Sequence, residues 1–197
     1  MDIVLGLTGK DYVLCVTDMS SNRSINALKH DEEKIVMIDD RKMLACGGEQ
    51  CSRNQFTEYI SKNLALNQLQ TDLELSNHGA ANFIRNEVAR ALRAKGGAYQ
   101  ANSILAGVDD QGPAMYYIDY MGSLVQVDYT AQGYCGYFSL SILDRYWKKN
   151  MTLEEGKELL KLCIEQLSAR FIIKLNKLQM VAIGPQGVIS KEIIISP

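Results

Sequence analysis

The order of hydrophobic periodicities is the feature of this chain that most restricts its fold. Segments with the alternating or continuous apolar character of β-strands occur in groups, and segments with the three-and-four spacing of amphipathic helices occur in pairs between those groups. The sequence therefore predicts strands, two helices, strands, two helices and a final strand pair. A parallel doubly wound sheet would require strands and helices to alternate one by one. We expect an α+β fold with antiparallel sheets.

The predicted strands are separated by short polar or glycine-containing turns, which is typical of hairpins. The first quarter of the chain holds two strand pairs, the middle holds three strands expected to form a meander, and the end holds one further hairpin. The expected strands cover residues 3–7, 12–17, 35–38, 43–46, 103–108, 114–120, 124–129, 179–183 and 188–195.

Four amphipathic segments predict four helices. The first runs from 51 toward 69, and the second begins after the N-cap residue Ser76 and ends at the glycine pair 96–97. The third covers 136–146, and the fourth opens with a capping box at 152–155 and continues to about 171. Two antiparallel sheets stacked face to face, with a helix pair on each outer surface, would bury every apolar stripe.

Composition limits the size and the partners of the protein. With 197 residues, of which 47% are apolar, the chain is expected to form one domain over residues 1–197 and to bury roughly 70% of its unfolded surface. Its net charge is −2, which predicts neither nucleic-acid binding nor attraction to an anionic membrane. No apolar run approaches the roughly 18 residues of a membrane-spanning helix.

The five cysteines form no metal or redox motif. Cys46 and Cys51 are four residues apart without a second pair, and His30 and His78 have no neighbours of ligand type. An odd number of cysteines in a chain without a secretory signal fits a reducing compartment. We expect buried, inert thiols, and no cofactor.

Three segments in the first quarter, residues 3–18, 33–35 and 45–49, resemble the amino-terminal half of proteasome β subunits, which belong to the amino-terminal nucleophile hydrolases. The resemblance implies a four-layer α-β-β-α sandwich. It extends over essentially the whole chain, and it sharpens toward a non-catalytic subunit at the fourth position of the eukaryotic β ring. The segments that carry this second resemblance are 1–6, 55–60, 116–120, 133–137 and 141–146.

In active members of the family a threonine hydroxyl attacks the scissile amide, while the α-amino group of that threonine, a lysine and an aspartate manage the proton. The resemblance places Asp2 at the nucleophile, Asp18 and Lys34 at the aspartate and lysine, and Gly48 at the glycine whose amide helps form the oxyanion hole. A carboxylate at position 2 supplies no alkoxide. The single residue before it is also expected to be too short for a propeptide.

The second half of the chain departs from the active pattern at two more places. A Gly-Tyr-Cys-Gly run at 133–136 replaces the family's serine-containing turn, Phe171 replaces an aspartate, and Lys174 replaces a serine. We therefore expect no catalytic residue. Asp18 and Lys34 would remain as an ion pair or as solvated charges. Gly48 would allow a neighbouring backbone segment to approach closely.

The resemblance implies that the chain is a structural β subunit of the 20S proteasome core, which degrades proteins in the cytoplasm and nucleus. Its implied partners are the neighbouring β subunits, the α ring and the opposite β ring, with assembly chaperones and regulatory caps acting through the particle. The tyrosine-rich stretch from Tyr116 to Tyr137 would help build the ring wall, and loop residues between Pro113 and Tyr137 could shape a neighbour's substrate pocket. Candidate interface residues are Tyr99, Tyr129, Tyr134 and Trp147.

Two alternatives remain open at this point. One is an active hydrolase of the same fold, whose mature chain would begin at Thr8 or Thr17 or would use Cys15 as nucleophile. The other is an unrelated α+β binding module, which would be a stable monomer.

Overall fold

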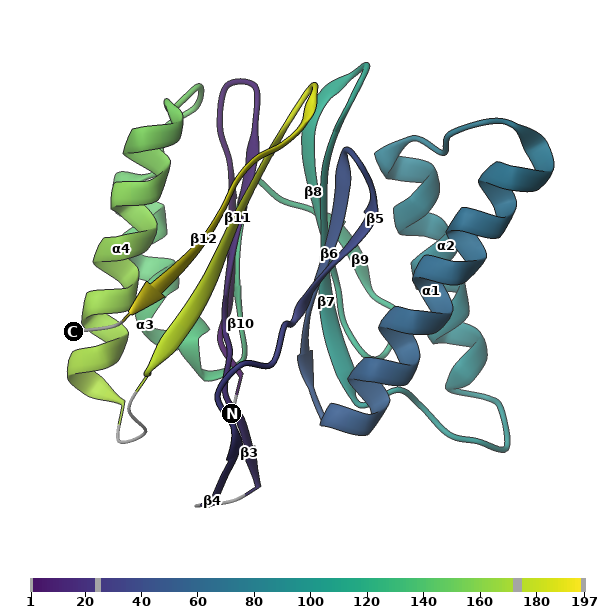
Figure 1. Ribbon diagram of the computed structural model, residues 1–197, viewed down its shortest axis with the longest axis horizontal. Coiled ribbons are helices and arrows are strands. Elements are labelled where there is room, and N and C mark those ends of the chain that lie inside the picture. Colours follow the sequence, from purple (N-terminus) through teal and green to yellow (C-terminus); the bar gives the residue numbers. More distant parts are fainter. Residues whose placement is uncertain (1, 24–25, 172–174, 196–197) are drawn as a thin grey trace.

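Two five-stranded antiparallel sheets lie face to face, and a pair of helices covers the outer surface of each (Figure 1). The computed structural model describes residues 2–23, 26–171 and 175–195. The layers follow the order helix pair, sheet, sheet, helix pair, so the predicted α+β four-layer sandwich is confirmed.

The first sheet has the strand order β10-β1-β2-β11-β12, and the second has the order β5-β6-β7-β8-β9. The first sheet consists of β1 (Val4–Thr8), β2 (Val13–Asp18), β10 (Tyr129–Gln132), β11 (Lys177–Gly184) and β12 (Gly187–Ile195). The second consists of β5 (Ile35–Asp39), β6 (Lys42–Gly48), β7 (Ala101–Asp109), β8 (Gly112–Ile118) and β9 (Leu124–Gln126). The smaller elements are the β3 (Ser21–Arg23) and β4 (Asn26–Lys29) hairpin and the 3-10 turn η1 (Gly133–Cys135).

Helices α3 (Gly136–Tyr146) and α4 (Leu153–Arg170) cover the first sheet, and α1 (Gln50–Thr71) and α2 (Asn77–Ala91) cover the second (Figure 1). The predicted caps are present. The Ser76 hydroxyl accepts a hydrogen bond from the Gly79 amide, and Thr152 and Glu155 form the reciprocal capping box.

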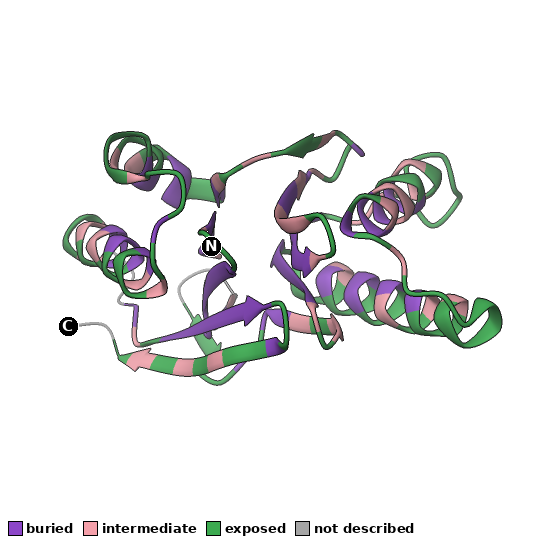
Figure 2. Ribbon diagram, turned by 90° about the horizontal axis from the view of Figure 1, so that it is seen from above, coloured by how far each residue is buried: buried purple, intermediate pink, exposed green. Residues whose placement is uncertain are grey.

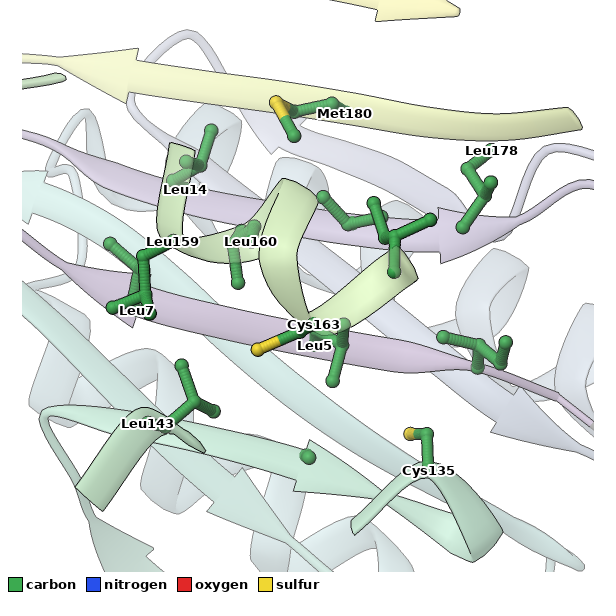
Figure 3. Close-up of a cluster of buried hydrophobic side chains, with 14 of the residues drawn as sticks. Leu5, Leu7, Leu14, Cys135, Leu143, Leu159, Leu160, Cys163, Leu178 and Met180 are labelled. Carbon is green, nitrogen blue, oxygen red and sulfur yellow. The ribbon is translucent and has the colours of Figure 1, made fainter. Parts of the chain in front are cut away.

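Three apolar clusters fill the spaces between the four layers. The clusters lie between the two sheets, between the first sheet and α3–α4, and between the second sheet and α1–α2. Successive residues of a strand point to opposite faces. Val4 of β1 therefore packs between the sheets, while Leu5 and Leu7 meet Leu160 of α4 (Figure 3). Both faces of β1 are covered, which explains its continuous apolar sequence.

The prediction of one strand over 124–129 is wrong. β9 ends at Gln126 beside β8, and the chain then crosses to the first sheet, where β10 pairs with β1. At the crossing the Val127 amide still donates to the Met115 carbonyl of the second sheet, and the Thr8 amide donates to the Asp128 carbonyl. Residue propensity favours an extended backbone over this segment but contains no information on which sheet each residue joins.

Two further expectations differ from the structure. The α2 helix ends at Ala91, and the chain reaches the predicted glycine pair through turns, with Gly97 at a φ of 81°. The β3–β4 hairpin was not predicted, because its residues are polar or exposed and lack a two-residue apolar alternation. The hairpin extends beyond the sandwich at the end where the chain begins (Figure 1).

Candidate functional site

The first strand pair fixes Asp2 at one end of the sandwich. The Ile3 amide donates to Asp18 Oδ1 at 2.8 Å, and the Asp18 amide donates to the Ile3 carbonyl at 3.2 Å. Asp18 is the last residue of β2, so the backbone next to Asp2 is tied to the end of β2. The side chains of Asp2 and Asp18 therefore lie at the same end of the fold.

Lys34, which directly precedes β5 in the opposite sheet, brings these two carboxylates together. Its fully buried ammonium lies 2.9 Å from each oxygen of Asp18 and 2.7 Å from Asp2 Oδ1, and it donates to the Ser20 carbonyl at 2.8 Å. An ammonium has three protons to donate, so these acceptors use all of them. Of the two structural readings of Asp18 and Lys34, the geometry shows the ion pair.

The second oxygen of Asp2 faces the end of β6. The Gly48 amide donates to Asp2 Oδ2 at 2.7 Å, and Arg53 Nη1 lies 3.5 Å from the same oxygen. Gly48 has a φ of 138°, and a β-carbon there would lie 2.2 Å from the Gln100 carbonyl oxygen. Only glycine fits this close approach between β6 and the chain before β7.

Two further charged residues, Arg53 and Glu32, extend this cluster and were not predicted from the sequence. Arg53 is buried on the inner face of α1, and its Nη2 lies 2.8 Å from Glu32 Oε1. Lys29 lies 3.5 Å from the other oxygen of Glu32. The available signal was that Arg53 shares the helical stripe of Phe56 and Ile60, because a charged residue on a core-facing stripe requires a buried partner.

The electrostatics of the cluster keep Asp2 ionised. Burial alone raises the pKa of Asp2, but the Lys34 ammonium, the Gly48 amide and the Arg53 guanidinium together outweigh burial and lower that pKa below its ordinary value. For Asp18, burial outweighs the effect of Lys34 and raises the pKa, and the nearby charge of Asp2 acts in the same direction. At neutral pH, Asp2 is therefore a carboxylate that accepts from Lys34 and from Gly48.

A cleft of about 790 Å³ opens beside this cluster. Its walls include Asp2, Gly48, Arg53 and Tyr134. Gln132 also lines the cleft, and its amide is buried without a hydrogen-bond partner among the described residues. The cleft is open, and the Asp2 carboxylate in its wall already accepts hydrogen bonds from the Lys34 ammonium and the Gly48 amide.

Among the described residues, the remaining predicted positions do not join the cluster. Phe171 packs edge-on against Phe138, with ring centroids 5.6 Å apart, and belongs to the core between the first sheet and α3–α4. Lys174 lies outside the described residues. Cys135, which the resemblance places in the family's serine-containing turn, is buried and donates its thiol proton to the Gln132 carbonyl. Burial raises the pKa of Cys135 to about 11, so this thiol is a poor nucleophile.

The residues that an active hydrolase would need as an alternative nucleophile are inside strands. Thr8 of β1 pairs with Val13 of β2, and Thr17 of β2 pairs with Val4 of β1. Cys15 is fully buried in β2, and burial raises its pKa to about 12. None of the three side chains faces the cleft.

The prediction of buried thiols is wrong for one cysteine. Cys15, Cys46, Cys135 and Cys163 are buried, but Cys51 is exposed in the first turn of α1. A residue in the first turn of a surface helix lies on the core face or the solvent face depending on the helix rotation, which spacing alone did not fix.

The four aromatic residues named as interface candidates divide into two groups. Tyr99 packs on Phe56, and Tyr129 and Trp147 pack on each other with ring centroids 5.4 Å apart, so these three are half-buried in the fold. Tyr134 is exposed at the rim of the cleft. Among the described residues, no group of three or more His, Cys, Asp or Glu side chains could hold a metal ion. No helix in the described ranges is long and apolar enough to cross a membrane.

Two facing antiparallel sheets between helix pairs, with the second residue of the chain held against a buried lysine, define the amino-terminal nucleophile hydrolase fold. The chain belongs to the proteasome subunit family, whose model matches residues 2–183.

Relatives named as β subunits cover nearly all of the chain. It is 42% identical to proteasome subunit beta type-2 of Dictyostelium discoideum over 192 residues, which is 95% of this chain and 96% of the relative. It is 41% identical to proteasome subunit beta type-2-A of Arabidopsis thaliana over 88% of this chain and 84% of that protein. It is also 36% identical to proteasome subunit beta type-4 of Saccharomyces cerevisiae, over 86% of each. The chain is a β subunit of the proteasome core, and it assembles with other subunits into the 20S particle.

Proposed function

We propose that this chain is a non-catalytic β subunit that builds the ring wall and cuts no peptide bond. The observation that carries the proposal is the position of the Asp2 carboxylate between the Lys34 ammonium and the Gly48 amide, 2.7 Å from each. Acyl transfer needs a nucleophile and a free donor for the developing oxyanion. Asp2 offers no hydroxyl, and its Oδ2 already accepts the Gly48 amide.

The ion pairs around Asp2 support a structural role for the former catalytic groups. Lys34, Asp18 and Asp2 join the ends of β1 and β2 to the start of β5 in the other sheet. A buried charge that is fully paired holds its neighbours in one geometry, and removal of one partner is costly. In this proposal the cluster fixes one end of the sandwich.

We place the chain, as one domain, in the β ring of a particle that acts in the cytoplasm and nucleus. Its neighbours would be two β subunits, the α ring and the opposite β ring, with assembly chaperones and regulatory caps reached through the particle. The course of the stretch from Tyr116 to Tyr137 supports a contribution to the wall, because it crosses from the second sheet to the first and ends at the cleft rim near Tyr134. A wall residue there could shape a neighbour's substrate pocket without taking part in the chemistry.

Assembled particles that contain an Asp2→Asn variant test the loss of catalysis. Asparagine keeps the size of Asp2 and removes its charge, so the proposal expects every peptidase activity of the particle to stay within about twofold of the unmodified particle. Removal of a true nucleophile lowers the activity of its site by orders of magnitude, up to about 10⁶-fold. Selective loss of one peptidase activity at normal assembly would contradict the proposal.

A further inference from the structure

The outermost strand of the first sheet, β12, has apolar side chains on its solvent side. Val188, Ile193 and Ile195 are 50%, 61% and 76% exposed. Ile193 and Ile195 alternate with less exposed residues along the strand, which forms the edge of the sandwich leading to the C-terminal end (Figure 2). Half-buried antiparallel strands ordinarily place apolar residues toward the core and polar residues toward water.

The opposite face of β12 is the more polar one. Glu192 lies 2.6 Å from Lys157 of α4, and Ile194 packs against the core beneath α4. A bulge leaves both Ile189 and Ser190 opposite Ala182 of β11, so these two residues share this inner face, whereas Val188 pairs with Ile183 and lies on the outward face. The strand therefore reverses the usual pattern, since three of its four outward residues, Val188, Ile193 and Ile195, are aliphatic.

The second sheet ends before it reaches β12. Val181 of β11 is buried between the sheets, while its cross-strand neighbour Lys191 is half exposed. Lys191 lies 2.8 Å from Glu33, which precedes β5, and a β-carbon on Gly187 would lie 3.2 Å from the Asp40 carbonyl oxygen after β5. The two edge strands β12 and β5 therefore approach each other at these two points.

Met37 of β5 lies on the same open side. Ile35 faces the space between the sheets, and Met37, two residues later, shares that face but is exposed. We call Met37, Val188, Ile193 and Ile195 the open-edge surface.

The charge and size of the open-edge surface restrict what can cover it. Glu33 neutralises Lys191, the one charged residue among the outward positions of β12, so a partner needs no compensating charge there. Four partly exposed aliphatic side chains offer on the order of a few hundred Å², the size at which an apolar patch marks an interaction site. A standard interface buries about 800 Å² per partner, so this surface would form the apolar centre of a larger contact.

We propose that the open-edge surface is the contact for a neighbouring subunit of the 20S particle, which lays an extended apolar segment along β12. Among the described residues β12 pairs with β11 alone, so the backbone groups on its other edge are free to pair with an added strand. A long, aliphatic strand edge promotes aggregation unless a partner covers it. The proposal rests on the place of this chain in the particle, but not on whether Asp2 is inert.

Incorporation of tagged chains into the particle is the first test. An Ile193→Asp, Ile195→Asp chain places two charges in the contact, and we expect it to enter the native particle at least about tenfold less than the unmodified chain, since one strong interface position accounts for a factor of ten or more. The matched control is Glu192→Gln, which changes the inner face of the same strand and should enter within twofold. Equal incorporation of all three chains would overturn the proposal.

Site-specific photocrosslinking covers the case in which the double variant fails to fold. A benzophenone amino acid at position 193 of the otherwise unmodified chain should crosslink to a different subunit in the purified particle, whereas the same probe at 192 should react within this chain. A probe at 193 that crosslinks nothing, or that joins a second copy of this chain, would overturn the proposal. If the unmodified chain itself were absent from the particle, the proposed function would fail instead, so the two failures are distinguishable.

Discussion

The Lys34 ammonium lies 2.9 Å from both oxygens of Asp18, and the two side chains are almost completely buried at 0% and 3% exposure. This pair also holds Asp2, whose Oδ1 is 2.7 Å from the same nitrogen. In the proposed account, groups that support an amine and a hydroxyl in active relatives instead support a carboxylate.

Loss of Asp18 should destabilise the fold strongly. Asp18→Ala leaves the buried Lys34 with one partly exposed carboxylate, and breaking a buried pair of this kind costs about 3–5 kcal/mol. Urea unfolding of the purified chain measures the change in the free energy of unfolding. Asp110→Ala is the control, since Asp110 is exposed and its ion pair with Arg41 is long, at 3.4 Å. Similar free energies for the two variants would show that the buried pair is not structurally important.

The contribution of Asp2 to stability should depend on pH. The folded pKa of Asp2 is lowered from 3.8, so the folded state favours the ionised form more than the unfolded state does. The stability difference between the unmodified chain and Asp2→Asn should be fully present above about pH 4 and should shrink as the pH falls through the lowered folded pKa. Unfolding curves of both proteins between pH 7 and pH 3 check this sign. A difference that grows with acidity would contradict it.

Gly48 should not tolerate a β-carbon. Gly48→Ala forces a side chain to within 2.2 Å of the Gln100 carbonyl oxygen at a φ of 138°, and we expect a loss of about 2 kcal/mol or more. Gly96→Ala is the matched control, because a β-carbon there meets nothing within 4 Å. Thermal unfolding should separate the two variants clearly, and equal melting temperatures would refute the close approach between β6 and the chain before β7.

Cys51 should be the one thiol that reacts in the folded chain. The other four cysteines are buried, and burial raises the pKa of Cys15 and Cys46 to about 12. Brief alkylation of the native chain should therefore add one label by intact mass, and alkylation after denaturation should add five. Peptide mapping should assign the native label to Cys51. Rapid labelling of Cys46 in the native chain would contradict the core between the second sheet and α1–α2.

Much of the architecture could be predicted because both faces of each central strand and one stripe of each helix are apolar. The sheet change between β9 and β10 could not, since Val127 and Asp128 differ in their long-range partners rather than in local propensity.

The residues of the site show the same division between what the sequence predicts and what depends on long-range contacts. Asp2, Asp18, Lys34 and Gly48 were found through family resemblance, whereas the ion pair of Arg53 and Glu32 joins residues from α1 and the segment before β5. Helical spacing places Arg53 on a core-facing stripe, but neither spacing nor composition identifies Glu32 as its partner.

The most direct test of the central claim is covalent labelling of the assembled particle. A broadly reactive peptide electrophile, such as a vinyl sulfone, forms an adduct with any subunit that presents an activated nucleophile. Intact-mass analysis of each subunit after saturation should show adducts on catalytic subunits and an unchanged mass for this chain, because Asp2 is a carboxylate held by Lys34 and Gly48. A stoichiometric adduct on this chain would contradict the account.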